Sequence, residues 1–524
     1  MIKRWLSFFE KKSPRRITLG IALLKGAKAA VGIFSVMIMA RYFGITLARD
    51  QWVVAISIIT ALVQFAFGPM NETFRSKLAH IRASSEAEFR QSVTSVIKWM
   101  TLFTLLISLA SVPFVDILIS LFGYERGTEA FSSLRFLVLI SLPILALSEL
   151  TTLLAGVLNL YGVYFIPEVF GIAGVLVNAL LVVFFAEKWG IYSLWLGTLL
   201  NLLVLFIVLW RELAKNGIGL REIGRAKMQG FKECFAFSAA MFLPLIFSQL
   251  AVLTERALAS RIGVGNVSGL DYARKFLDVP LGIVTASIAT VLGPVLANHF
   301  GTRNLSLFYA ETARVARMMI LGSIPLLLVL FVAPEMFTRV LLKRGVFDET
   351  AVLLTADLLR LFVPGIIGAI LFSAMGQALI ASGRLSRLVF VTIFVQGGVI
   401  AGNVFLSRVY QVYAFPLSWS LMHLLVGTVM LAGLLSESRR AGVSLLGVVA
   451  LSLGLGGLFS LLRTVLDVNT WSFLLVVVFG AVLAVLAAIR SLRLLGFTEE
   501  NAFLTKVIPG WGSGAGSNHT DRAL

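Results

Sequence analysis

The chain has 524 residues, of which 58% are hydrophobic and only 14% are charged, so it carries too little charge to cover the surface of a soluble domain. The formal net charge is +18 at pH 7; in a membrane protein we expect most of that charge in loops that orient the helices, and we predict no nucleic-acid partner. The single cysteine, Cys234, excludes a disulfide framework and a thiolate metal site.

Apolar runs of about 20 residues recur along the chain, and each is long enough to cross a bilayer as a helix. They predict an all-α polytopic membrane protein with about 14 transmembrane helices. The fourth and tenth spans are long and contain Pro143 and Pro364, so we expect kinks there. The spans are centred near Ile33, Ile59, Leu106, Leu145, Val177, Leu203, Pro244, Ala286, Leu327, Ile367, Val395, Leu424, Leu455 and Phe479.

Basic and less basic loops alternate between the spans. The N-terminal segment and the loops after spans two, six, ten and twelve are rich in Lys and Arg, whereas residues 115–134 contain Arg126 as their only basic residue. Because basic loops stay in the cytoplasm, both termini are predicted to be cytoplasmic. The expected parts are a basic lead-in (1–16), a six-helix bundle (17–215), a cytoplasmic linker (216–231), a second six-helix bundle (232–436), two additional helices (437–495) and a cytoplasmic tail (496–524).

A repeat relates the first six spans to the next six. Residues 41–69 and 261–294 share one plan: an Arg, a turn containing Gly, an Asp and an apolar span that ends in Gly-Pro. Gly162 and Gly383 continue the match at the same offset of about 221 residues. Six is an even number, so the two copies share their orientation, and a pseudo-two-fold axis along the membrane normal is expected. This is a layout of alternating-access transporters.

Four basic residues are predicted to bind substrate. Lys25 and Lys28 lie on one face of the first span, and Arg274 and Lys275 lie at the start of the eighth. Charges at membrane depth usually face a cavity or a partner, so we expect a basic cavity between the two halves that suits a phosphate or diphosphate group. The alternatives are that Lys25 extends to the cytoplasmic interface and that the basic pair of span eight is an interfacial anchor.

A second group is predicted to act in gating or coupling: Asp50, Glu255, Arg256 and Asp271. Glu255 and Arg256 are equally compatible with a static ion pair, and Asp50 with a cap on the first external turn.

Catalytic and nucleotide-binding patterns are absent from the sequence, since it contains no HExxH, CxxC or Walker loop. We therefore expect a transporter with no metal and no cofactor, coupled to an ion gradient, to the membrane potential or to the gradient of its own substrate.

Two motifs carry a resemblance to a known family. RYFG at 41–44 followed by Asp50, and DYARK at 271–275 followed by VPLG at 279–282, resemble the signature of the MurJ (MviN) family in the MOP exporter superfamily. The resemblance implies a flippase that moves lipid II, the undecaprenyl-diphosphate-linked precursor of peptidoglycan, across the bacterial inner membrane. It also implies that a cavity-facing cation falls on Lys275 and an acidic residue at the mouth of span two on Asp50. The implied partners are a polyprenyl-diphosphate-linked glycan, the bilayer and proteins of cell-envelope biosynthesis.

The first span departs from the family pattern. Ala29 and Ser35 stand where the family has arginines, and Lys25 and Lys28, one turn earlier, are predicted to substitute for them. A different lipid-linked glycan, for an exopolysaccharide or an O-antigen, is therefore an alternative cargo. A cation-coupled drug exporter would need an acidic cavity, and a membrane glycan polymerase or ligase would need a large external loop; the sequence favours neither.

Overall fold

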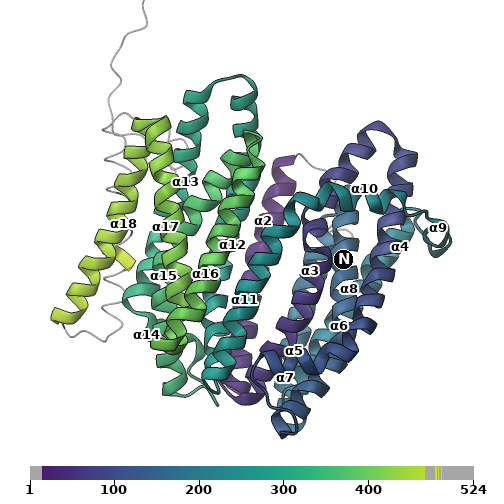
Figure 1. The fold of residues 1–524 in the computed structure, drawn as a ribbon, viewed down its shortest axis with the longest axis horizontal. Coiled ribbons are helices and arrows are strands. Elements are labelled where there is room, and N and C mark those ends of the chain that lie inside the picture. The colour runs from purple at the N-terminus through teal and green to yellow at the C-terminus, as the bar shows by residue number, and fades with distance from the viewer. Residues whose placement is uncertain (1–13, 467–477, 481, 483–485, 487–524) are drawn as a thin grey trace, which may run out of the picture.

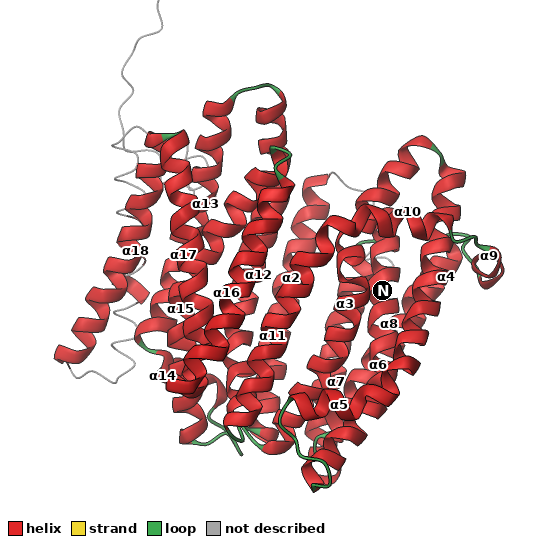
Figure 2. Ribbon diagram, in the orientation of Figure 1, coloured by secondary structure: helices red, strands yellow, loops and turns green. Residues whose placement is uncertain are grey.

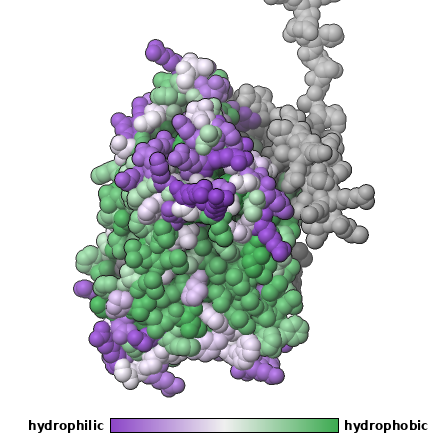
Figure 3. All heavy atoms as spheres, turned by 90° about the vertical axis from the view of Figure 1, so that its right-hand side faces the viewer, coloured by the Kyte–Doolittle hydropathy of each residue, from purple (hydrophilic) through white to green (hydrophobic). Residues whose placement is uncertain are grey.

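The computed structural model describes residues 14–466, 478–480, 482 and 486, and all regular secondary structure in this part of the chain is helical (Figure 2). Within these described residues, eleven helical runs are long and apolar enough to cross a membrane. On the face of the first half, Figure 3 shows a broad hydrophobic band with hydrophilic residues gathered at both ends of the helices. The prediction of an all-α polytopic membrane protein is confirmed.

In the part of the chain that the structure describes, thirteen helices of at least 21 residues correspond to the first thirteen predicted spans. The structure does not describe residues 1–13 or the tail 496–524, and it describes only a few residues of the fourteenth span near Phe479. The number of fourteen spans therefore stays a prediction. The helix of the first span includes residues from Pro14 on, so the last residues of the expected lead-in belong to it.

The first half consists of antiparallel helices joined by short turns, with a short helix between the third and fourth spans (Figure 1). Its elements are α2 (Pro14–Phe43), α3 (Leu47–Ser84), α4 (Glu86–Ser111), η1 (Val112–Phe114), α5 (Val115–Leu121), α6 (Glu129–Leu160), α7 (Phe165–Trp189) and α8 (Tyr192–Lys215).

The second half repeats the same order and is followed by α18 (Arg439–Leu466). Its elements are α11 (Phe242–Ile262), α12 (Asn266–Gly301), α13 (Leu305–Val332), α14 (Pro334–Leu342), α15 (Glu349–Ala381), α16 (Leu385–Tyr410), η3 (Gln411–Tyr413) and α17 (Ala414–Glu437).

Packing partners repeat along with the element order. In the first half α2 packs on α7, α3 on α6 and α6 on α8, and in the second half α11 packs on α16, α12 on α15 and α15 on α17. Residues with positive φ also recur 221 residues apart, as in Gly162 and Gly383, and Gly190 and Gln411. The prolines Pro143 and Pro364 lie at equivalent positions inside α6 and α15.

Polar side chains cap the N-termini of several helices in both halves. Thr128 accepts a hydrogen bond from the backbone N–H of Phe131 at 3.1 Å, and Asp348 accepts one from Ala351 at 2.9 Å, so both long central helices α6 and α15 have an N-cap. Such caps satisfy backbone donors that a helix cannot satisfy itself. They explain why these long helices begin where they do.

The connection between the halves is helical and packs on the first half. It contains α9 (Leu220–Arg225), α10 (Gln229–Ser238) and η2 (Ala239–Met241), and α10 contacts α3 and α4. The predicted boundary at residue 232 therefore lies within α10. We call the end of the molecule that carries α9 and α10 the linker end, and the opposite end, which carries the turns before α3 and α12, the latch end (Figure 1).

Candidate functional site

The two halves interlock at the latch end through Asp50. Its carboxylate accepts hydrogen bonds from the backbone N–H of Gly265 at 2.6 Å, from the N–H of Ser268 at 2.8 Å and from the Ser268 hydroxyl. Helix α12 begins directly after Gly265, which has no side chain to cap it. The N-terminal cap of α12 is therefore supplied by α3 of the other half.

Four glycines with positive φ allow the halves to approach closely at this end. They form two repeat-related pairs, Gly44 with Gly265 and Gly123 with Gly345. A Cβ added to any of them would lie within 3.0 Å of an atom of the other half, for example 2.3 Å from the Arg41 carbonyl oxygen in the case of Gly345. We call this contact region the latch; its glycines and the atoms that face them are Gly44 with Val346 O, Gly123 with Arg261 Cγ, Gly265 with Ile45 O, and Gly345 with Arg41 O.

Hydrogen bonds between the halves complete the latch. The N–H of Val346 donates to the carbonyl of Arg41 at 2.9 Å, and the Arg261 guanidinium donates to the carbonyl of Leu121 at 2.8 Å. In each case the chain at or just after the end of a short helix, α5 or α14, meets the end of the first long helix of the other half. This reciprocal contact closes the latch end.

An ion cluster lies directly behind the latch. Arg49 donates to Asp271 Oδ2 at 2.7 Å, Lys275 Nζ lies 3.3 Å from the same oxygen, and Arg256 donates to Oδ1 at 3.4 Å. Three cations thus share one carboxylate, and the shortest of the contacts joins the two halves. The Arg49 side chain is buried, whereas that of Lys275 is 36% exposed.

A cavity of about 200 Å³ opens beside this cluster, between α3, α11 and α12. Arg49, Asp271 and Lys275 provide its charged lining. The rest of its wall comes from Trp52, Val53, Ile56, Ser57, Thr60, Gln249 and Val252. The cavity therefore combines an excess of positive charge with a mixed polar and apolar wall at the boundary of the halves.

Arg274 is turned away from this cavity, into the second half. Its Nε donates to Glu255 Oε1 at 2.8 Å, a second guanidinium nitrogen donates to Oε2, and the guanidinium lies 4.8 Å from the centre of the Phe362 ring. Arg256 lies beside the same carboxylate, with 4.0 Å between its Nε and Oε1 of Glu255. The structure thus places the predicted gating pair Glu255 and Arg256 in an ion network that also contains Arg274.

Lys25 and Lys28 lie on α2, and neither lines the cavity. Lys25 is exposed, and Lys28 Nζ lies 3.4 Å from Glu168 Oε2 of α7 with 47% of its side chain exposed. Of the four predicted substrate ligands, the structure brings only Lys275 to the cavity. A role of the other three in binding stays a prediction.

The residue that sequence reasoning missed is Arg49. Two signals were available: Arg49 stands in the first turn of an apolar span, and its neighbour Asp50 is the repeat partner of Asp271. The contact between α3 and α12 could not be read from that pattern, because it depends on how the two halves meet. Among the described residues, no group of three His, Cys, Asp or Glu side chains is placed to hold a metal ion.

A family model described as "Lipid II flippase MurJ" matches residues 39–466. The lipid II flippase MurJ of Burkholderia cenocepacia is 24% identical over 379 residues, which cover 69% of this chain and 72% of that one. The probable lipid II flippase MurJ of Borreliella burgdorferi is 25% identical over 348 residues, 64% of this chain and 67% of that one.

Solved structures show the same fold. One titled "Lipid II flippase MurJ, inward closed conformation" superposes with a TM-score of 0.74 at 19% identity and covers 91% of this chain and 99% of that one. The inward-facing structure of a multidrug resistance MATE family transporter of the MOP superfamily has a TM-score of 0.60 at 15% identity and covers 78% of this chain and 98% of that one.

Proposed function

This chain belongs to the lipid II flippase MurJ family, as its motifs predicted, and on that premise we propose that it translocates lipid II across the bacterial inner membrane by alternating access. A flippase moves a lipid between leaflets and neither makes nor breaks a covalent bond, so the chain is a transporter and not an enzyme. Its substrate is a lipid-linked molecule in the membrane.

The observation that carries the proposal is the cavity between the halves, with Arg49 and Lys275 in its lining. Both cations now share the carboxylate of Asp271. A diphosphate offers stronger and more numerous acceptors than one carboxylate, and it would compete for both cations.

Competition for Arg49 would connect binding to movement. The bond from Arg49 to Asp271 is one of the contacts that hold α3 against α12, next to the cap that Asp50 supplies. When a phosphate oxygen replaces the carboxylate, this bond between the halves is lost and the latch is weakened. A substrate that binds the open state better than the closed state shifts the equilibrium by its differential affinity.

The distribution of basic residues orients the molecule in this proposal. The linker end, which carries α9 and its Arg221 and Arg225, lies in the cytoplasm, and the latch end faces outward. Both termini are then cytoplasmic, the substrate enters from the linker side, and release requires the latch to open. An ion gradient or the membrane potential supplies the energy, and proteins of cell-envelope biosynthesis are the expected partners.

An apolar cavity suits the polyprenyl tail. It measures about 340 Å³ and lies between α13, α15 and α18, with Leu327, Val363 and Leu453 among its lining residues. Helix α18 belongs to the additional segment after the two repeats. We place the tail along this helix, outside the polar route of the headgroup.

The test is complementation in a Gram-negative cell whose own lipid II flippase can be shut off. Survival with the intact chain shows that lipid II is an accepted cargo, whereas lysis despite verified insertion shows that the cargo is another lipid-linked glycan. Lys275→Ala, alone and with Lys28→Ala, should abolish rescue. Lys188→Ala, which removes an exposed lysine at the end of α7, is the matched control and should rescue fully. Unchanged rescue by the double variant would contradict the phosphate site.

A further inference from the structure

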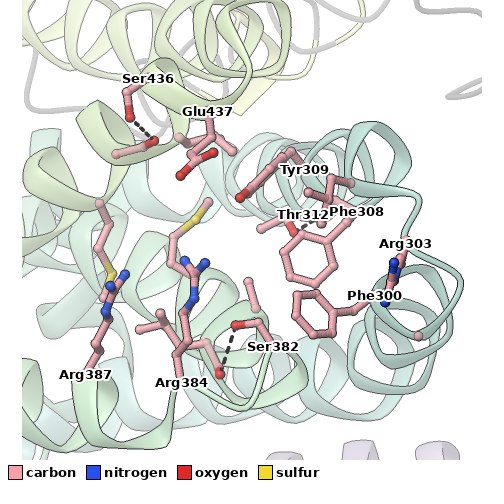
Figure 4. A pocket seen from close by; sticks show the side chains of 18 residues that line it. Phe300, Arg303, Phe308, Tyr309, Thr312, Ser382, Arg384, Arg387, Ser436 and Glu437 are labelled. Carbon is pink, nitrogen blue, oxygen red and sulfur yellow. Dashed lines mark hydrogen bonds between the residues drawn. The ribbon is translucent and has the colours of Figure 1, made fainter.

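A further cavity lies inside the second half, at the linker end (Figure 4). It measures about 820 Å³ and is bounded by the ends of α12, α15 and α17 and the beginnings of α13 and α16. Figure 4 shows Arg384 extending into it, with Arg387 on the same side and Arg303 across the cavity. It is separate from the cavity between the halves, since the two share no lining residue.

The repeat provides an internal control for this cavity. The apolar lining residues that α15 and α17 contribute are Met375, Ala378, Leu379, Met430 and Leu434. The residues 221 positions earlier are at most 1% exposed and belong to one core cluster; they are Leu154, Val157, Leu158, Leu209 and Leu213. The region that is hollow in the second half is therefore filled in the first.

In the first half, Arg82 covers the filled region. Its guanidinium donates to the carbonyl of Leu160, pairs with Glu86 at 3.2 Å and lies over the rings of Phe89 and Tyr161 at 5.1 and 5.4 Å. Every one of these partners belongs to the same half. The guanidinium of Arg82 is therefore already paired with groups of its own bundle.

The equivalent residue of the second half, Arg303, lacks these partners. Leu307 and Ser382 stand at the positions of Glu86 and Tyr161, and Arg303 itself has a positive φ of 55°. Two further arginines, Arg384 and Arg387, stand where the first half has Val163 and Ile166, which pack against its core. No ion pair joins any of these three arginines to a carboxylate among the described residues.

The lining is thus an apolar floor with a basic rim. Glu437 is its acidic residue, and the Tyr309 hydroxyl points toward it (Figure 4), so the three arginines keep an excess of positive charge. Unpaired guanidinium groups beside an apolar wall match a molecule with an anionic phosphate at one end and hydrocarbon at the other. Basic pockets between transmembrane helices at the cytoplasmic surface recognise lipid headgroups in this way.

We propose that this cavity binds one anionic phospholipid, with its phosphate on Arg384, Arg387 and Arg303 and an acyl chain on the apolar floor. The proposal rests on the proposed orientation, which puts the linker end in the leaflet rich in anionic lipid, and not on the identity of the transported cargo. The bound lipid would fill in the second half the volume that side chains fill in the first. It would therefore hold α13, α15 and α17 together at this end.

The test uses the purified full-length protein, stripped of lipid in detergent and titrated with phosphatidylglycerol, phosphatidylcholine or inorganic phosphate, with the bound molecules counted by native mass spectrometry. We expect one tightly bound phosphatidylglycerol and about tenfold weaker binding of phosphatidylcholine, the factor that one good charged contact of about 1.4 kcal/mol provides. Equal binding of the two lipids would overturn the proposal. Inorganic phosphate that displaces the lipid at similar concentration would assign the site to free phosphate instead.

The informative variant is Arg384→Val with Arg387→Ile, which gives the second half the side chains of the first. It should lose the bound phosphatidylglycerol, whereas Arg221→Ala with Arg225→Ala, two exposed arginines of α9, should keep it. Retention by the first double variant would show that the arginines do not hold the lipid.

Ser382→Tyr is the second test variant, to be used if the double variant does not fold. It keeps the arginines and inserts the ring that Tyr161 provides in the first half. We expect loss of the bound lipid with an unchanged or higher unfolding temperature; a lipid bound as before would contradict the placement of the acyl chain.

Discussion

The cap that Asp50 supplies to α12 should control how often the latch opens. In Asp50→Ala, the N–H groups of Gly265 and Ser268 lose their acceptor while the latch is closed. Leaving a buried donor unsatisfied costs about 1–3 kcal/mol, so two of them cost about 3 kcal/mol. In the open state water can reach both groups, and the cost falls on the closed state alone.

A shift of about 3 kcal/mol corresponds to about a 100-fold rise in the ratio of open to closed molecules, since about 1.4 kcal/mol is tenfold. The assay follows Ser57→Cys, which lines the cavity, with a membrane-impermeant maleimide added from the latch side. Closing that is fast relative to labelling makes the labelling rate proportional to the open population. The native Cys234 is buried and should not contribute.

The control removes an acidic residue at the same end that does not join the halves. Asp116 accepts from Arg135 at 2.6 Å within the first half, with both side chains more than a third exposed, so Asp116→Ala should change the labelling rate by less than about fivefold. If Asp50→Ala labels no faster than this control, the cap does not hold the latch closed, and the reasoning is refuted.

Three further outcomes follow from the geometry. Gly345→Ala should destabilise the latch-closed protein by at least about 2 kcal/mol in thermal unfolding, because its Cβ would lie 2.3 Å from a carbonyl oxygen of the other half. The control Gly127→Ala also has a positive φ but lies in open space, so it should cost about 1 kcal/mol. Arg274→Ala leaves the carboxylate of Glu255 buried without its bidentate partner and should lower stability by about 3 kcal/mol. Burial raises the pKa of the Cys234 thiol to about 12, so at pH 8 almost no thiolate forms and a thiol reagent should react only after unfolding.

Each of these outcomes can be contradicted directly. Equal losses in Gly345→Ala and Gly127→Ala would mean that backbone strain, and not the close approach of the halves, decides the effect. A fully stable Arg274→Ala protein would show that Arg256 or water compensates Glu255. Rapid reaction of Cys234 in the folded protein would show that α10 leaves the first half often.

The sequence predicted those features that depend on local patterns. Span positions follow from runs of apolar residues, and the repeat follows from turn glycines that keep their spacing, as in Gly162 and Gly383. The candidate site was harder to predict from the sequence. Lys275 was placed at the cavity because the motif around it predicts a site, whereas Arg274, its neighbour, points to Glu255, since adjacent residues on a helix face different directions.

The sequence by itself therefore determined the class of protein, the duplicated bundle and the family, because hydropathy, turn glycines and short motifs are properties of contiguous segments. Only the tertiary structure decided which charges meet. Arg49 and Asp271 are 222 residues apart, and their contact depends on how two bundles of similar sequence dock at the latch end. The same docking lets α3 cap α12, and differences in side-chain packing fill one half at the linker end and leave the other hollow. These are contacts between surfaces, and no pattern within one segment encodes them.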